Sequence, residues 1–164
     1  MNDTKPKFQV VDHIPAIVPK VFQTMIGTEV TVTAARPGGG ERISGAIGIA
    51  GETVTGTVYL HLPLKLAEAV TRAMLQLPAN DPIGDSDVND VLGELSNMVG
   101  CGLKSQLNDA DYFCAVSTPS VIRGSFVVEA MQGATTDLFY FDCFGQRLAV
   151  EVHLNLDQVP TSTL

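Results

Sequence analysis

One long amphipathic stretch near the middle of the chain constrains the fold more than any other feature. Between about Ser86 and Asn108 the apolar residues recur at helical spacing and share one broad face. They are Val88, Val91, Leu92, Leu95, Met98, Val99 and Leu103. Such a face packs against a core, and Ser86 or Asp87 is a suitable N-cap residue. The pattern therefore predicts a long helix with one buried side.

Shorter periodic segments on both sides of this helix predict the remaining elements. An apolar stripe from Val11 to Met25 predicts a first helix, with Pro15 in its first turn and a kink or break at Pro19. Pro63 begins another helix that extends to about Leu77. Segments rich in Val, Ile and Thr predict strands, the first three of them as an antiparallel meander. These segments are Glu29–Ala35, Arg42–Ala50, Thr53–Leu62, Tyr112–Thr118, Val121–Ala130, Thr136–Phe144 and Arg147–Leu156, with a hairpin turn at Phe144-Gly145-Gln146.

The order of the predicted elements indicates the fold class. Helices occur in blocks between blocks of strands, which is typical of an α+β fold rather than of a doubly wound parallel sheet. The 164 residues, 45% of them hydrophobic, suffice for one core, and no linker divides the chain. We expect a flexible tail over residues 1–9, a single domain over residues 10–158 and a frayed end at Pro160–Leu164.

The composition excludes several classes of partner. Eighteen acidic residues against ten basic ones give a formal net charge of −8. This charge opposes binding to nucleic acid or to an anionic membrane, because phosphate recognition needs a basic surface. No apolar run approaches the roughly 20 residues of a membrane span, and Met1–Lys7 lacks the apolar stretch of a signal peptide. We therefore expect a cytoplasmic protein.

The potential metal ligands of the Cys and His types are scattered along the chain. They are Cys101, Cys114, Cys143, His13, His61 and His153. No CxxC pair occurs, so neither a disulfide framework nor a zinc site is expected. We expect the cysteines to be free thiols and the histidines to have structural roles, with no metal bound by this chain.

A row of polar residues lies on the side of the long helix opposite to its apolar face. Asp90, Glu94 and Asn97 are separated by four and three residues and therefore stack on one side, and Cys101 continues the row. Small residues run beside them at Gly93, Ser96 and Gly100. From the residues alone, a solvated face and the close approach of a neighbouring helix, such as the one containing Leu64–Leu77, are open alternatives to a functional site.

The segment Asp90-Val-Leu-Gly-Glu94-Leu-Ser-Asn97-Met-Val-Gly-Cys-Gly resembles the signature of the CheC/CheX/FliY family of chemotaxis phosphatases. In that signature an acidic residue or Ser is followed after three residues by Glu and then after two by Asn. Pro119 stands where the family has a distal proline, with a gap one residue shorter than usual. The first helix contains no Glu-x-x-Asn, so the single site resembles the CheX type. The resemblance implies a CheC-like fold, in which a mostly antiparallel sheet packs against a pair of long helices plus an N-terminal helix.

The resemblance also implies a function. It predicts hydrolysis of the aspartyl phosphate of a CheY-like response regulator in chemotaxis or a related two-component pathway. Asn97 would orient the attacking water, and Glu94 would pair with a lysine of the regulator. We expect docking contacts from the positions Asp90, Gly93, Gly100 and Cys101, and a structural role for Pro119 at the start of a strand.

Cofactor, assembly and alternatives follow from the same resemblance. Mg²⁺ is expected on the partner regulator and no cofactor on this chain, and CheX members typically form homodimers. The alternative is a non-catalytic binding or adaptor module that keeps the fold without turnover. A small-molecule sensor has no cofactor motif to support it, and the Arg36-Pro-Gly-Gly-Gly40 segment is expected to be a hairpin turn.

Overall fold

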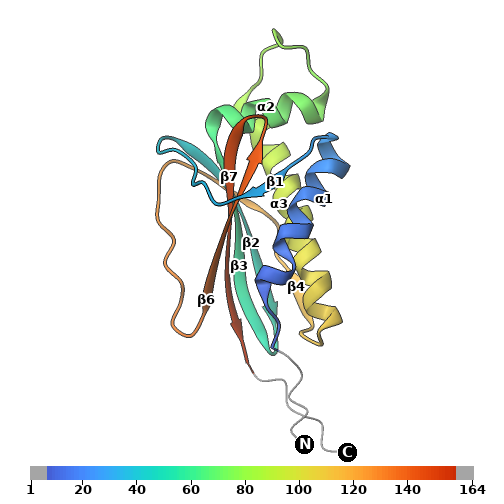
Figure 1. Ribbon diagram of the computed structural model, residues 1–164, viewed down its shortest axis with the longest axis vertical. Coiled ribbons are helices and arrows are strands. Elements are labelled where there is room, and N and C mark those ends of the chain that lie inside the picture. Colours follow the sequence, from blue (N-terminus) through green and yellow to red (C-terminus); the bar gives the residue numbers. More distant parts are fainter. Residues whose placement is uncertain (1–6, 158–164) are drawn as a thin grey trace, which may run out of the picture.

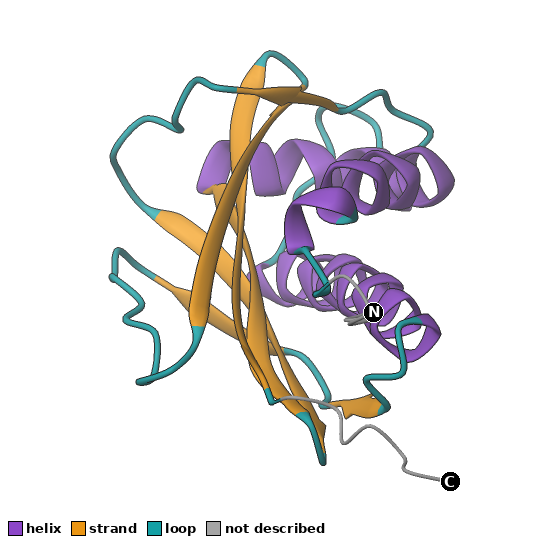
Figure 2. Ribbon diagram, turned by 60° about the horizontal axis from the view of Figure 1, so that its bottom comes forward, coloured by secondary structure: helices purple, strands orange, loops and turns teal. Residues whose placement is uncertain are grey.

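The computed structural model describes residues 7–157, which form a sheet with its helices packed on one face (Figures 1 and 2). The first part contains η1 (Val10–Asp12), α1 (Ile14–Ile26), β1 (Thr31–Thr33), β2 (Arg42–Gly51) and β3 (Val54–Pro63). The second contains α2 (Leu64–Leu75), α3 (Asp85–Asp109), β4 (Cys114–Val116), β5 (Ser120–Arg123), β6 (Thr135–Cys143) and β7 (Gln146–Leu156). The predicted α+β class and the three longer predicted helices are confirmed.

The strands of the described residues form one seven-stranded sheet in the order β1-β6-β7-β3-β2-β4, with β5 also paired to β2. All of these pairings are antiparallel. The predicted pairing of the second and third strands is confirmed, but β1 pairs with β6, so the three-strand meander was wrong. The reason is that β4 and β5 occupy the other edge of β2. Residues 34–41 are therefore a connection between distant strands, not a hairpin turn.

Two further predictions are corrected at the chain's N-terminal end and after β5. Residues 1–6 and Pro160–Leu164 lie outside the described residues. Phe8, which was predicted to belong to a flexible tail, is buried and stacks on His13 at 4.5 Å between ring centroids. The predicted strand Val121–Ala130 ends at Arg123, because Gly124 turns the backbone with a φ of +119°. Pro19 lies inside α1 without ending it.

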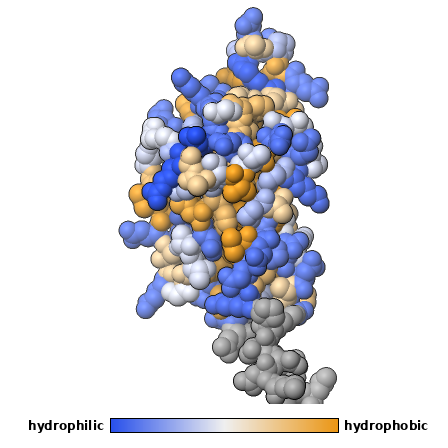
Figure 3. Space-filling model, viewed as in Figure 1, coloured by the Kyte–Doolittle hydropathy of each residue, from blue (hydrophilic) through white to orange (hydrophobic). Residues whose placement is uncertain are grey.

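The segment after β5, residues 124–134, is a loop that runs across the sheet on the side away from the helices (Figure 1). Val127 and Met131 in this loop are 88% and 83% exposed, and Leu138 at the start of β6 is 47% exposed. Figure 3 shows hydrophobic residues among the hydrophilic ones on the face that it displays. The surface of the described residues is thus not uniformly polar.

Helix α3 is positioned by its first turn and by its buried side. Its N-cap is Gly84, and Asp87, predicted as an alternative N-cap, accepts a hydrogen bond from the Gly84 amide at 2.9 Å. Six of the seven apolar residues predicted to face the core are buried, and Met98 is half-buried. The polar row on its other side is therefore held outward by a well-packed core face.

Small residues allow α3 to lie close to strand β2. A Cβ added to Gly45 of β2 would meet the Ser96 hydroxyl, and a Cβ added to Gly100 would lie 2.7 Å from Ile47 Cγ2. On the α1 side, a Cβ at Gly102 would lie 2.8 Å from Ile17 Cγ2. Ser96 and Gly100 thus serve contact with the sheet, which the predicted alternatives did not include, whereas Gly102 allows the close approach of a neighbouring helix, α1 and not the helix of Leu64–Leu77.

We expect Gly100→Ala to destabilise the fold although alanine is the better helix former. Overpacking against Ile47 costs roughly 1–3 kcal/mol, and the gain in helix propensity is about 1 kcal/mol. Urea denaturation should therefore give a free energy of unfolding lower than that of the wild type by up to about 2 kcal/mol.

Gly93→Ala on the same helix is the matched control. Its Cβ would lie 3.6 Å from Pro119 Cγ, an ordinary van der Waals distance. Alanine should therefore leave stability unchanged or raise it by about 0.5–1 kcal/mol. A Gly100→Ala protein as stable as Gly93→Ala would contradict the close packing of α3 on β2.

Candidate functional site

The polar row of α3 borders an open groove on the surface. Asp90, Glu94 and Asn97 all line this groove, which has a volume of about 650 Å³. Asp90 and Glu94 are exposed, whereas Asn97 is half-buried. The structure therefore brings the three predicted site residues together on one wall, with Asn97 the most enclosed of them.

The opposite wall of the groove comes from the segment that joins β4 to β5. It consists of Ser117, Thr118 and Pro119 of this connection, together with Val116 at the end of β4 and Val121 of β5. The Ser117 hydroxyl donates to the Thr118 carbonyl at 2.9 Å and accepts a hydrogen bond from the Gly48 amide at 2.9 Å. These bonds fix the wall to strand β2. Only Pro119 was predicted as a site residue here, because the strand predicted over Tyr112–Thr118 does not by itself show which element it lies beside.

The side-chain amide of Asn97 has unused hydrogen-bonding capacity. Its Oδ1 accepts a long, weak bond from the Cys101 Sγ at 3.9 Å, one turn further along the helix. Its Nδ2 has no hydrogen-bond partner among the described residues. A half-buried amide of this kind can donate to a bound oxygen and accept from a water molecule without changing its protonation state.

The groove is acidic along the α3 wall. Asp90 and Glu94 line it together with Asn89, and none of the residues that line it is Lys or Arg. Arg123 lies near the start of α3, where its Nη2 donates to Asn89 Oδ1 at 2.9 Å and to the Asp85 carbonyl at 3.2 Å. Within residues 7–157 neither Asp90 nor Glu94 forms an ion pair. The two carboxylates are therefore available to a cation that another molecule supplies.

The small residues predicted to let a partner approach differ in position. Gly93 lines the groove beneath Pro119, so its lack of a side chain leaves room for that proline. Gly100 is buried against Ile47 of the sheet and does not line the groove. The prediction of a docking contact at Gly100 was therefore wrong. Helical periodicity puts Gly100 near the polar row, but the sheet extends under that edge of the helix.

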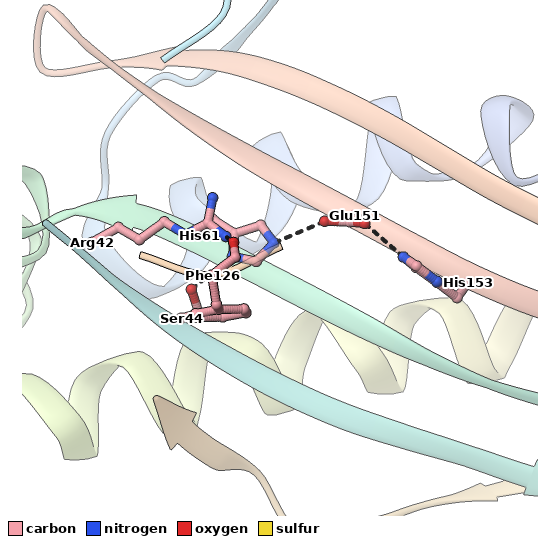
Figure 4. Close-up of polar contacts among 6 residues, drawn as sticks. All are labelled: Arg42, Ser44, His61, Phe126, Glu151 and His153. Carbon is pink, nitrogen blue, oxygen red and sulfur yellow. Dashed lines mark hydrogen bonds and ion pairs between the residues drawn. The ribbon is translucent and has the colours of Figure 1, made fainter. Parts of the chain in front are cut away.

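Two of the three histidines predicted as scattered lie together on the other face of the sheet (Figure 4). Glu151 of β7 joins them, with its Oε2 3.1 Å from His61 Nε2 and its Oε1 2.6 Å from His153 Nε2. The other ring nitrogen of His61, Nδ1, is 2.7 Å from the Ser44 hydroxyl. Sequence spacing gave no signal for this cluster, because it depends on the pairing of β3 with both β2 and β7.

Burial lowers the pKa of His61 from its ordinary value of 6.5, and the nearby positive charge of Arg42 lowers it further. The hydrogen bond to Glu151 and its charge act in the opposite direction, and His153 adds to the lowering. A neutral imidazole fits the contacts, since Nε2–H can donate to Glu151 while Nδ1 accepts from Ser44.

The remaining candidate features concern metals, thiols and membranes. Among residues 7–157, no group of three or more His, Cys, Asp or Glu side chains could hold a metal ion. Cys101 and Cys114 are half-buried free thiols, and burial raises the pKa of Cys143 to about 11. None of the helices in the described part of the chain has the length and apolar character needed to span a membrane.

Comparison with known proteins identifies relatives by family and by fold. A family model described as "Chemotaxis phosphatase CheX" matches residues 43–141. No curated protein sequence matches the chain significantly.

Solved structures resemble the chain over most of its length. The chemotaxis protein CheX from Vibrio vulnificus has a TM-score of 0.74 at 23% identity, covering 88% of this chain and 95% of its own. A CheC-like superfamily protein from Shewanella sp. PV-4 has a TM-score of 0.75 at 22% identity, with coverages of 90% and 99%. The CheX-CheY-BeF3-Mg complex from Borrelia burgdorferi has a TM-score of 0.71 at 16% identity, with coverages of 90% and 98%.

The His61 cluster predicts a dependence of stability on pH. Because the folded-state pKa of His61 is lowered, its contribution to stability is fully present above pH 6.5 and is lost as pH falls below that value. In this acidic range the unfolded chain binds a proton at His61 more readily than the folded chain does. Melting temperatures measured between about pH 5 and about pH 8 should therefore fall on the acidic side.

His61→Gln should flatten this profile, since glutamine does not titrate in the range. His13→Gln is the control, because it removes a histidine that stacks on Phe8, away from the Glu151 cluster. Identical pH profiles for the wild type and His61→Gln would show that His61 is not the group responsible.

Proposed function

This chain belongs to the chemotaxis phosphatase CheX family, and we propose that it hydrolyses the aspartyl phosphate of a CheY-like response regulator. The observation that carries the proposal is the half-buried Asn97, with a free side-chain Nδ2, beside the exposed Glu94 in an open groove. An open groove suits a phosphoryl group that a partner protein presents. The complex of the Borrelia relative with CheY, BeF3 and Mg supports a partner of this kind.

Asn97 is the proposed catalytic residue. An acyl phosphate needs a water molecule held in line with the bond that breaks, and little covalent chemistry from the protein. The Asn97 amide can accept a hydrogen bond from this water and donate one to a phosphoryl oxygen. Its position at the enclosed part of the groove supports this role, because the water would be shielded once a partner covers the opening.

Glu94 is proposed to dock and orient the partner. A carboxylate next to a phosphoryl group opposes the reaction unless a cation compensates its charge. No cation of the described residues pairs with Glu94, so the partner has to supply one, and a lysine of the regulator would do so. This ion pair would lie one turn from Asn97 and would hold the partner with its phosphoryl group beside the Asn97 amide.

The neighbouring residues complete the proposed interface. Asp90 extends the acidic edge one turn before Glu94, and Cys101 contacts the Asn97 side chain one turn after it. Gly93 and Pro119 shape the groove between its two walls. In this assignment Asp90 and Gly93 contact the partner, Cys101 lies at the edge of the contact, and Pro119 holds the opposite wall.

Magnesium, assembly and location are part of the same proposal. The acidic residues of the regulator would hold Mg²⁺, which the presence of Mg in the Borrelia complex supports. We propose that the domain over residues 10–158 acts as a homodimer in the cytoplasm. Exposed hydrophobic side chains, such as Val127 and Met131, support a protein contact outside the groove.

We expect Asn97→Ala to lower the rate of phosphate release by about 10²–10³, the usual loss when one well-placed polar group is removed. The fold should be unaffected, since the only hydrogen bond of the Asn97 side chain among the described residues is the weak one with Cys101. The measurement is phosphate release over time from each purified, phosphorylated response regulator of the source organism.

Ser105→Ala is the control, because Ser105 is exposed on the same helix outside the groove. It should retain the wild-type rate. An Asn97→Ala protein as active as Ser105→Ala would remove Asn97 from the catalytic role. A wild-type protein that binds a regulator stably without turnover would instead indicate the adaptor function.

Glu94→Ala should weaken binding of the phosphorylated regulator as well as the rate. Loss of an interfacial charge pair changes both the affinity and its dependence on salt. Affinities measured by calorimetry at low and high salt should show a smaller salt dependence for the variant.

Asp109→Ala makes the same change of charge at the far end of α3, outside the groove. It controls for the effect of net charge on association. If Glu94→Ala and Asp109→Ala bind the regulator with equal affinity, Glu94 has no docking role.

A further inference from the structure

A second cavity lies on the face of the sheet opposite to α3. Its volume is about 320 Å³, and loop residues 36–41 and 125–126 form its rim. Arg42, His61 and Glu151 belong to its walls and project from the face opposite to Ile47, which faces the helix. The groove of Asn97 and this cavity are therefore separated by the sheet.

Arg42 is a half-buried cation without a carboxylate partner. Its guanidinium lies over the Phe126 ring at 4.7 Å from the ring centroid and donates from Nη2 to the Phe126 carbonyl. Its Nε is shielded from solvent and has no hydrogen-bond partner among the described residues. No ion pair joins Arg42 to any carboxylate within residues 7–157. A half-buried guanidinium with unpaired N–H groups is stabilised by a carboxylate that a ligand supplies.

The Glu151 carboxylate in the wall is already paired. Both oxygens of Glu151 are used, one by His61 and one by His153 (Figure 4). The other ring nitrogen of His61 is used by Ser44. This network is complete without Arg42, so Glu151 cannot turn toward the guanidinium without leaving a histidine unpaired.

The charge and polarity of the lining indicate the chemistry of a ligand. Arg36 and Arg42 contribute two positive charges, and Glu41 and Glu151 contribute two negative ones. A lining that is neutral overall disfavours a doubly charged phosphate, whereas one guanidinium matches one carboxylate in a two-pronged pair. The remaining walls include Phe126, Leu138, Tyr140 and Ala149, which suit an apolar body.

We infer that this cavity binds a small organic carboxylate, with its carboxylate on Arg42 and its apolar part against Phe126 and Tyr140. The size agrees, since about 320 Å³ is near the lower end of small-molecule pockets, roughly 300–1,000 Å³. The rim is open along Gly38, Gly39 and Gly40, where an added Cβ would meet no atom within 4 Å. The Ser125 hydroxyl donates to the Gly40 carbonyl at 3.0 Å and joins the two rim loops.

The experiment titrates the full chain with benzoate, phenyl phosphate and the uncharged isostere benzamide. Backbone amide NMR shifts report the dissociation constant and the location of binding. We expect benzoate to bind saturably, with shifts at Gly38–Gly40 and Ser125 and none at Glu94 or Asn97. Benzamide should bind at least about 10-fold more weakly, because it cannot form the charged pair.

Arg42→Gln should weaken benzoate binding by about 10-fold or more. Arg147→Gln is the matched control, because Arg147 pairs with Asp142 at 3.2 Å outside the cavity. If Arg42→Gln does not fold, Arg42→Lys serves instead, since it keeps the charge and loses the two-pronged geometry. It should also bind benzoate more weakly than the wild type.

Four outcomes would overturn the inference. They are no saturable benzoate binding, equal affinity for benzoate and benzamide, tighter binding of phenyl phosphate than of benzoate, and benzoate binding that the Arg42 variants leave unchanged. Each is independent of phosphatase activity, so failure of this inference would leave the proposed role of Asn97 intact.

Discussion

The close contact between α3 and strand β2 is the interaction on which the rest of the structure depends. Ser96 lies directly over Gly45, and Gly100 lies over Ile47, so helix and sheet meet with little side-chain volume between them. This fixes the distance of α3 from the β4–β5 segment, which is itself bonded to β2 through Ser117 and Gly48. The width of the groove therefore follows from glycine and serine positions that never touch a substrate.

The arrangement of the α3 row could be predicted from sequence because it is local. Helical periodicity alone places Asp90, Glu94 and Asn97 on one side, and the different roles proposed for them rest on the resemblance to the family signature. Pairing of strands is not local, which is why β1 was assigned to the wrong neighbour. Its three residues carry no pattern that distinguishes the edge of β6 from the edge of β2.

The errors at Gly100 and at the histidines have the same physical origin. Helical periodicity gives the direction of Gly100 from the helix axis, but only the folded sheet shows what lies in that direction. His61 and His153 are far apart in the chain and meet because β3 and β7 are neighbours. Contacts that depend on the order of the strands could thus not be predicted from periodicity, whereas the buried apolar face of α3 could.

The contact between Gly45 and Ser96 also limits how the sequence of the protein could change. Moving α3 along β2 by one residue would be a shift of about 1.5 Å and would bring larger side chains over Gly45 and Ile47. The position of α3 along β2 is therefore fixed. The joining segment of Ser117, Thr118 and Pro119 is bonded to β2 through Ser117, but all three side chains are exposed and none is packed under the helix. Adaptation to a differently shaped regulator would accordingly accumulate in that segment, while the helix register stayed constant.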